Sequence, residues 1–232
     1  MKIKISILGS TGSIGSTTLK AIDKKKKLFS INLLSADKNY KSINKQILKY
    51  KPKIFVISDL KTFLKIKKKF KRSKTKIFND YDKNNLTKSD VTISSIPGLA
   101  GLEPTMLMIE KSKKILIANK ESVICGWDLI KKSAAKHKTK IVPIDSEHFS
   151  ILKLLENHKI EEIKKIYLTA SGGPFLNFSQ RQLKNISPIH ATKHPKWKMG
   201  KKISIDSSNL MNKVLELIEA FRLFKFNPKK CH

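Results

Sequence analysis

Short apolar runs alternate with helical stretches through much of the chain, and this alternation constrains the fold more than any other feature. Runs of four to six aliphatic residues bounded by turn residues are typical of buried strands. The expected strands are Ile3–Leu8, Ile31–Leu34, Ile54–Ile57, Val91–Ser94, Ile115–Ala118 and Ile141–Ile144. Helical patterns lie between them, at Ile14–Ile22, Ser42–Tyr50 and Leu129–His137. Strands that alternate with helices predict a parallel sheet covered on both faces.

A glycine-rich segment, Gly9-Ser-Thr-Gly-Ser-Ile-Gly15, lies between the first expected strand and the first expected helix. Glycines let the backbone turn sharply and approach a pyrophosphate, and the helix N-terminus supplies N–H groups. The hydroxyls of Ser10, Thr11 and Ser13 add possible donors. A tight turn without a ligand remains the alternative, but the strand before and the helix after are what a dinucleotide-binding fingerprint requires.

The pattern changes after about Pro143, where we expect a domain boundary. The pattern predicts a Rossmann-like α/β domain over residues 1–144 and a second domain, of the α+β class, over residues 145–232. The second part is expected to hold a helix near Phe149–Glu156, a strand at Ile163–Ala170 and a final helix from about Asn209 to Phe224. Polar loops are expected at 171–175, 194–200 and 206–208.

The residues after the second strand should distinguish NAD from NADP. An acid there binds the ribose 2′-hydroxyl, whereas a basic residue accommodates the 2′-phosphate. Asp37 and Lys38 stand side by side at this position. These two residues alone do not decide between NAD and NADP, because each indicates a different coenzyme.

Two polar segments follow later strands. The segment Asn119–Ser122 comes directly after Ile115–Ala118, so it is expected at the carboxyl edge of the sheet, where ligands bind; a plain helix start is the alternative. Asp145 and Glu147 are two apart on an extended segment and project to one side. Such a pair offers hard oxygen ligands to Mg²⁺ or Mn²⁺, although acidic pairs at solvated strand ends are also common.

The last expected helix carries a third group of polar residues. Asn212, Lys213 and Glu216 are spaced so that they share one face. They form either an ordinary surface pair or a helix that presents Glu216 to a metal ion and its neighbours to a phosphate.

Composition excludes some classes of protein. The formal net charge is +31, but all except three of the 49 basic residues are lysine. Nucleic-acid readers usually use arginine, which pairs bidentately with phosphate and guanine. No apolar run is long enough to span a bilayer. The two cysteines, Cys125 and Cys231, lack metal-ligand spacing and are expected to be small buried hydrophobes in a reducing, cytoplasmic protein.

Seven segments in order resemble the successive signatures of the 1-deoxy-D-xylulose 5-phosphate reductoisomerase family. They are Leu8–Gly15, Ala118–Ser122, Pro143–His148, Leu168–Phe175, His194–Gly200, Ile203–Ser207 and Met211–Ala220. The resemblance runs from Lys2 to Phe224. It implies an NADPH- and Mg²⁺- or Mn²⁺-dependent enzyme that rearranges and reduces 1-deoxy-D-xylulose 5-phosphate to 2-C-methyl-D-erythritol 4-phosphate, in the non-mevalonate route to isoprenoids.

The resemblance also implies roles for individual residues. NADPH would contact Ser10, Thr11, Gly12, Ser13, Ile14, Lys38, Asn39, Asn119, Glu121 and Gly200. Asp145, Glu147 and Glu216 would hold the metal. The substrate would contact Lys120, Ser146, Glu147, Ser171, His194, Trp197, Ser207, Asn212, Lys213 and Glu216, with Lys120, Glu147 and His194 acting in catalysis. Position 37 departs from the family, since Asp37 stands where glycine is usual.

The family is longer than this chain, so the sequence is expected to stop before the catalytic domain is complete. The alternative to an active enzyme is an inactive remnant that keeps only nucleotide binding.

Family members are homodimers, and a homodimer is doubtful for a shortened chain. No nucleic acid or membrane is expected as a partner. A semialdehyde dehydrogenase can share the glycine segment, but Cys125 has no convincing base partner.

Overall fold

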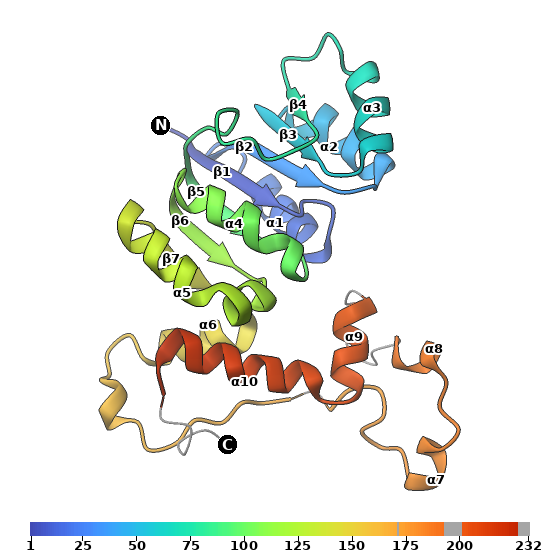
Figure 1. The fold of residues 1–232 in the computed structure, drawn as a ribbon, viewed down its shortest axis with the longest axis vertical. Coiled ribbons are helices and arrows are strands. Elements are labelled where there is room, and N and C mark those ends of the chain that lie inside the picture. The colour runs from blue at the N-terminus through green and yellow to red at the C-terminus, as the bar shows by residue number, and fades with distance from the viewer. Residues whose placement is uncertain (171, 193–200, 227–232) are drawn as a thin grey trace. The chain divides into compact units, whose positions relative to one another are not determined.

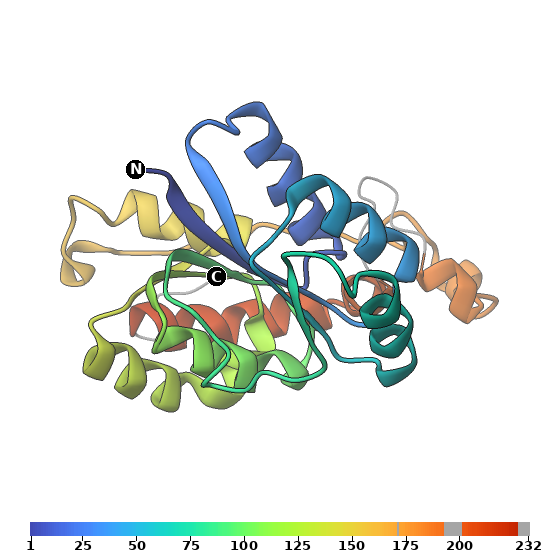
Figure 2. The ribbon, with the colours of Figure 1, turned by 90° about the horizontal axis from the view of Figure 1, so that it is seen from above.

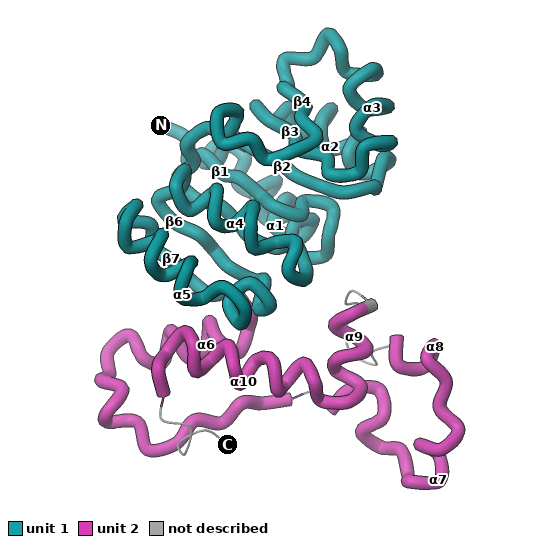
Figure 3. The backbone as a smooth tube through the Cα atoms, viewed as in Figure 1, with its two compact units in different colours: residues 1–144 teal, residues 145–232 magenta. Residues whose placement is uncertain are grey.

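The computed structural model describes residues 1–170, 172–192 and 201–226, and its chain divides into two compact units. Unit 1 is Met1–Ile144 and unit 2 is Asp145–His232 (Figure 3).

Unit 1 is built around a seven-stranded parallel sheet. Its strands are β1 (Ile3–Leu8), β2 (Phe29–Ala36), β3 (Ile54–Ile57), β4 (Lys76–Phe78), β5 (Ser89–Ser94), β6 (Ser112–Ile117) and β7 (Lys140–Pro143). Their order across the sheet is β4-β3-β2-β1-β5-β6-β7. The chain therefore winds outward from β1 in one direction, crosses back, and continues from β5 in the other.

Helices cover both faces of this sheet. They are α1 (Ser13–Lys24), α2 (Tyr40–Tyr50), α3 (Leu60–Lys69), α4 (Leu102–Ile109) and α5 (Lys120–His137), with a short 3₁₀ turn η1 (Leu99–Gly101) before α4. Figures 1 and 2 show α1 and α2 on one face and α4 and α5 on the other. Because parallel crossovers are right-handed, reversing the winding direction at β1 moves the later helices to the opposite face.

The core of unit 1 explains why the strand positions could be read from the sequence. Every residue of β3 is buried, as is the second half of β1. The helices face this core with residues such as Leu19, Ile43 and Ile66. Strands buried on both faces need continuous apolar runs rather than alternation.

The reversal of winding creates a switch point between β1 and β5. The backbone N–H and the hydroxyl of Ser95 both donate to the carbonyl of Leu8, at 3.1 and 2.7 Å. The two strands thus end side by side, and Gly9 after β1 lies directly against Ser95 after β5. Open α/β sheets bind ligands in the crevice at this kind of position.

The described part of unit 2 consists of helices joined by segments without regular secondary structure. It contains α6 (Ser146–Leu154), a 3₁₀ turn η2 (Ile160–Glu162), α7 (Gln180–Leu183), α8 (Pro188–Ala191), α9 (Lys201–Ser208) and α10 (Met211–Phe224). The helices α6 and α10 pack together over an apolar cluster that includes Ile151, Ile166, Ala220 and Phe224.

The structure confirms the expected parallel sheet and its helices, and corrects three local expectations. The strand expected at Ile163–Ala170 is absent; only an isolated bridge occurs, at Ile166, because no strand of the described part of unit 2 lies beside it. The loop expected at 206–208 belongs to α9. Cys125 is exposed on α5 rather than buried, while Cys231 lies outside the described residues.

Among the described helices, none combines the length and the apolar character needed to cross a membrane.

Candidate functional site

The glycine segment forms a tight turn that crosses the carboxyl ends of β1 and β5. Gly9 has a φ of +82°, and a Cβ atom there would lie 2.9 Å from the carbonyl oxygen of Ser95. A Cβ on Gly15 would lie 2.6 Å from Cα of Ser10. Gly9 is therefore required both for its positive φ and because there is no space for a Cβ atom, and Gly15 for lack of space alone.

The start of α1 presents backbone N–H groups to solvent. The N-cap residue is Gly12, which has no side chain to cap the helix. The first α-helical hydrogen bond runs from the N–H of Ser16 to the carbonyl of Gly12. The N–H groups of Ser13, Ile14 and Gly15 precede that bond and have no intrahelical acceptor. Gly12, Ser13 and Ile14 are exposed, and Thr11 is half-buried. An uncapped, exposed helix N-terminus of this kind binds anions such as pyrophosphate.

Ser10 has a different place from its neighbours. Its side chain is fully buried, and its hydroxyl bonds to the carbonyl of Ser35 at 3.0 Å and to Oε1 of Gln46 at 2.6 Å. The amide of Gln46 returns a bond to the carbonyl of Ser10 at 2.9 Å. The Ser10 hydroxyl, expected as a donor to the nucleotide, is instead engaged inside the protein and fixes the loop.

The residues expected to choose the coenzyme follow β2. Asp37, Lys38 and Asn39 are all exposed. The side chain of Asn39 caps α2 by accepting a bond from the Ser42 N–H at 3.1 Å. Lys38 lies close enough to Asp59 to help lower the pKa of that carboxyl, after the larger effect of hydrogen bonds from Thr62. The lysine is thus available at the surface beside the carboxyl end of β2.

Asn119 ties the end of β6 to the loop after β5. Its Nδ2 donates to the carbonyls of Ile96 and Gly98, and its Oδ1 accepts from the Ser122 N–H at 2.6 Å, which caps α5. Its side chain is 3% exposed. Next to it, Lys120 is buried and Glu121 is half-buried in the first turn of α5. The segment therefore shapes the sheet edge at which the nucleotide was expected.

Unit 2 brings together three carboxyl groups that are distant in sequence. Asp145 is the N-cap residue of α6, although its side chain makes no capping bond, and Glu147 lies in the first turn of that helix. The expectation that both lie on an extended segment was therefore wrong, and Glu216 reaches them from α10. Each of the three has an oxygen within 4.8 Å of the others, and Glu216 is buried. Carboxylates at such separations repel one another unless a proton or a cation lies between them.

Lys213 and Asn212, from the first turn of α10, contact these carboxylates. The Lys213 ammonium is 3.1 Å from Oε1 of Glu147 and also pairs with Glu216. Asn212 Nδ2 donates to Glu216 at 2.5 Å. Burial lowers the pKa of Lys213, but the two glutamates outweigh it and raise that pKa above its usual value. Burial likewise raises the pKa of Glu147, yet the interactions of its carboxyl group with Asp145, Ser146 and the Lys213 ammonium outweigh burial and hold that pKa at about 2.

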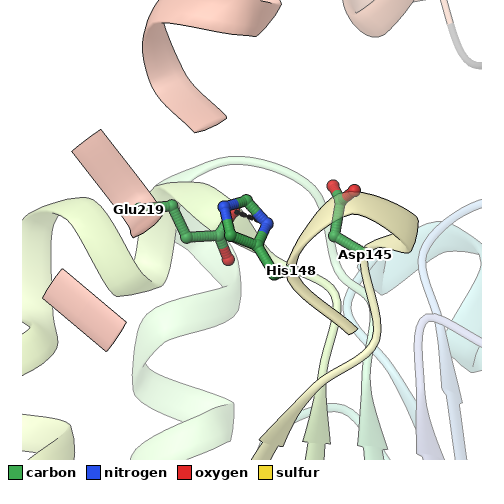
Figure 4. Close-up of side chains that lie close together, drawn as sticks. All are labelled: Asp145, His148 and Glu219. Carbon is green, nitrogen blue, oxygen red and sulfur yellow. Dashed lines mark ion pairs between the residues drawn. The ribbon is translucent and has the colours of Figure 1, made fainter. Parts of the chain in front are cut away.

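This group fits a divalent cation. Its donors are hard oxygens from three carboxylates, the set that Mg²⁺ and Mn²⁺ prefer. Glu147 is ionised at neutral pH, and one ammonium does not neutralise three carboxylates. A second group of potential ligands, Asp145, His148 and Glu219, meets the same distance limit (Figure 4).

The remaining expected substrate residues are only partly described. Ser146 donates to Glu147 at 2.6 Å. Ser207 lies near the end of α9, where its backbone closely approaches Gly173, so this glycine-containing loop lies beside α9. Ser171, His194, Trp197 and Gly200 lie outside the described residues.

Sequence reasoning gave no role to a buried pair in unit 2. His148 Nδ1 is 3.3 Å from Oε2 of Glu219, and both side chains are at most 1% exposed. His148 Nε2 is 2.9 Å from the carbonyl oxygen of Glu216. A signal was present in the sequence, because Glu219 is a second acid one turn after Glu216 and stands among the apolar residues Leu217, Ile218, Ala220 and Phe221.

The fold and the glycine turn define unit 1 as a Rossmann-like nucleotide-binding domain, followed in the chain by a carboxylate group suited to a metal. Two family models match: 1-deoxy-D-xylulose 5-phosphate reductoisomerase over residues 5–126, and its C-terminal domain over residues 141–224. The chain belongs to the 1-deoxy-D-xylulose 5-phosphate reductoisomerase family.

Individual relatives agree with this assignment. The 1-deoxy-D-xylulose 5-phosphate reductoisomerase of Pelagibacter ubique is 50% identical, over 98% of this chain and 60% of its own length. The enzyme of that name from Zymomonas mobilis, solved in complex with NADPH, is 33% identical with a TM-score of 0.86, and a DOX-P reductoisomerase solved with NADPH, fosmidomycin and magnesium is 34% identical with a TM-score of 0.89. Both structures are matched over 100% of this chain and 60% of their own. The chain thus spans about three fifths of the length of these relatives.

Proposed function

We propose that this chain carries the NADPH-binding part and the metal- and phosphate-binding part of a 1-deoxy-D-xylulose 5-phosphate reductoisomerase. The reaction is the rearrangement and NADPH-dependent reduction of 1-deoxy-D-xylulose 5-phosphate to 2-C-methyl-D-erythritol 4-phosphate. The observation that carries the proposal is the meeting of Asp145, Glu147 and Glu216, which lie in two separate segments of the sequence, in one partly buried carboxylate group. Membership of the family and relatives solved with NADPH and magnesium support it.

In unit 1, the proposed role of the glycine turn is to hold the pyrophosphate of NADPH. The exposed N–H groups of Ser13 and Ile14 at the start of α1 are donors of the right kind, and Thr11 and Ser13 add hydroxyls. Lys38 is proposed to pair with the 2′-phosphate, which NADH lacks. Asn119 and Glu121 are proposed to line the nicotinamide side, and Lys120 to reach the substrate.

In unit 2, Asp145, Glu147 and Glu216 are proposed to hold a divalent cation. When bound, such an ion acts as a Lewis acid that polarises a carbonyl oxygen of the substrate. Glu147, ionised and hydrogen-bonded to Ser146, keeps its carboxylate oriented toward Glu216. Asn212 and Lys213 are proposed to bind the substrate phosphate with Ser171 and Ser207, so that binding energy far from the reacting carbons positions the substrate. His194, Trp197 and Met199 are proposed to belong to a segment that excludes water from the site, and Gly200 to contact NADPH.

The proposal includes a cytoplasmic location and, for proteins of the relatives' length, a homodimer. The alternative function is that of an inactive remnant that binds nucleotide without turnover. It differs from the enzyme in one measurable respect, because both bind NADPH but only the enzyme consumes it.

Titrating the 232-residue chain with NADPH, NADH and Mn²⁺ tests both functions, followed by NADPH consumption on adding 1-deoxy-D-xylulose 5-phosphate. We expect tighter binding of NADPH than of NADH, and one Mn²⁺ per chain. Consumption that requires both substrate and metal supports the enzyme, and binding without consumption supports the remnant. Absence of both NADPH and Mn²⁺ binding by the folded chain would refute the proposal.

A further inference from the structure

Glu219 is an acid in the apolar core of unit 2. It is 1% exposed on α10, one turn after Glu216, and the cluster around that turn contains Ile151, Ala220 and Phe224. An apolar residue would fill such a position without the penalty of burying a carboxyl group. The presence of an acid therefore calls for a partner, and His148 lies beside it as one.

His148 reaches across from α6 to α10 (Figure 4). Its ring is fully buried and stacks on Phe224, with 6.4 Å between ring centroids and 17° between ring planes. One ring nitrogen, Nδ1, meets Oε2 of Glu219 at 3.3 Å. The other, Nε2, meets the carbonyl oxygen of Glu216 at 2.9 Å. The ring is held at both ends by α10.

The chemistry of the acceptors fixes the arrangement of protons. A backbone carbonyl only accepts, so Nε2 of His148 carries the hydrogen that it donates to Glu216. Nδ1 of His148 and Oε2 of Glu219 face each other at 3.3 Å, an ion-pair distance, without the geometry of a hydrogen bond. The bond from Nε2 sets the orientation of the ring, so the two groups stay in contact whether or not they are charged.

The pair joins the two segments that hold the carboxylate group. His148 is adjacent to Glu147 on α6, and its ring binds the main chain of Glu216 on α10. The Lys213 ammonium pairs with the carboxylates of both Glu147 and Glu216, but its long side chain does not fix the backbone of either residue. We infer that Glu219 is a positioning residue: through His148 it fixes the backbone of Glu216 against α6, and so sets the spacing of the carboxylates before a metal ion arrives.

This inference rests on the proposed metal site and makes a separate prediction about metal affinity. Residues that orient metal ligands without touching the metal typically change its affinity by about 10- to 100-fold. Glu219→Leu fills the space without the contact to His148, and we expect it to weaken Mn²⁺ binding at least tenfold. Glu219→Gln can still donate to Nδ1, and we expect it to stay within about threefold of the unchanged chain.

The experiment is calorimetric titration of the 232-residue chain and its variants with Mn²⁺, with circular dichroism to verify folding. Because Glu219→Leu leaves Nδ1 of His148 without its partner and could lower stability, the double variant His148→Leu/Glu219→Leu removes both polar groups from the core. We expect it to fold and to bind Mn²⁺ as weakly as Glu219→Leu. Glu156→Gln, which removes an exposed acid of unit 2, is the charge-matched control.

The outcomes separate this inference from the proposed function. If the unchanged chain binds no Mn²⁺, the metal site itself fails. If it binds Mn²⁺ and the folded leucine variants bind equally well, Glu219 only packs the core and the inference is overturned. A loss with Glu219→Gln as large as with Glu219→Leu also overturns it, because the charge of Glu219 would then matter rather than the contact with His148.

Discussion

Replacing Glu216 by glutamine is expected to remove metal binding while leaving the nucleotide site intact. At an effective dielectric constant of about 20, a divalent ion about 3 Å from the charge of Glu216 gains about 11 kcal/mol from it. The repulsion of that carboxylate by Asp145 and Glu147 is the same with and without the ion and does not change the affinity, whereas the amide oxygen of glutamine still offers a ligand atom and recovers part of the loss. A net loss of at least about 4 kcal/mol corresponds to a roughly thousandfold weaker affinity.

Calorimetry with Mn²⁺ on the Glu216→Gln and unchanged chains measures this change directly. The affinity for NADPH, followed by fluorescence, is expected to stay within about twofold, because the glycine turn belongs to unit 1. Glu156→Gln again controls for the loss of one negative charge. A change in Mn²⁺ affinity smaller than tenfold in Glu216→Gln would refute the assignment of this carboxylate as a ligand.

Three further changes test other parts of the chain. Gly9→Ala is expected to destabilise unit 1 by roughly 1–3 kcal/mol, because of its positive φ and the contact with Ser95; an unchanged urea midpoint would contradict this. Lys38→Ala is expected to weaken NADPH binding at least tenfold and NADH binding hardly at all, and equal losses in fluorescence titrations would argue against a 2′-phosphate contact. Asp90→Asn tests pH dependence, since a hydrogen bond from Lys113 lowers the pKa of Asp90. Because the folded pKa is depressed, Asp90 stabilises the protein above its unfolded pKa of about 3.9 and loses this effect as the pH falls through the lowered value. The exposed pair is worth less than about 1 kcal/mol, so unfolding at pH 6 and at pH 2 should show a small difference between variant and unchanged chain only at pH 6.

The sheet of unit 1 was predictable because its strands are buried on both faces. The expected strand Ile54–Ile57 matches β3, and Ile3–Leu8 matches β1. By contrast, β4 is an edge strand of three residues that includes a lysine, so its apolar signal is too short to stand out. The helix α3 was missed because its lysines mask the apolar stripe formed by Phe63 and Ile66.

The second unit was harder to predict for a different physical reason. The pattern at Ile163–Ala170 is locally that of a strand, but a strand also needs a neighbour to accept its backbone hydrogen bonds. Sequence patterns describe the segment and not its neighbour. The same limit hid the contact of His148 with α10, whose atoms come from residues 68 positions apart.

For the three carboxylates, the order of motifs along the chain was more informative than the spacing of the individual residues. Asp145 and Glu147 alone could equally be a solvated acidic pair, and Glu216 alone a surface partner of Lys213. Only the resemblance to a family joined the three in advance, and the structure brings their oxygens together. Whether these residues hold a metal stays a prediction that the titrations above address.

The burial of Ser10 has an entropic consequence for ligand binding. A flexible loop loses conformational freedom when it closes on a phosphate, and this loss reduces affinity. Here the hydroxyl of Ser10 and the amide of Gln46 already hold the turn in one conformation, with bonds of 2.6 and 2.9 Å from a helix that follows the next strand. The turn is therefore rigid before any nucleotide arrives, and its readiness to bind depends on a glutamine 36 positions away.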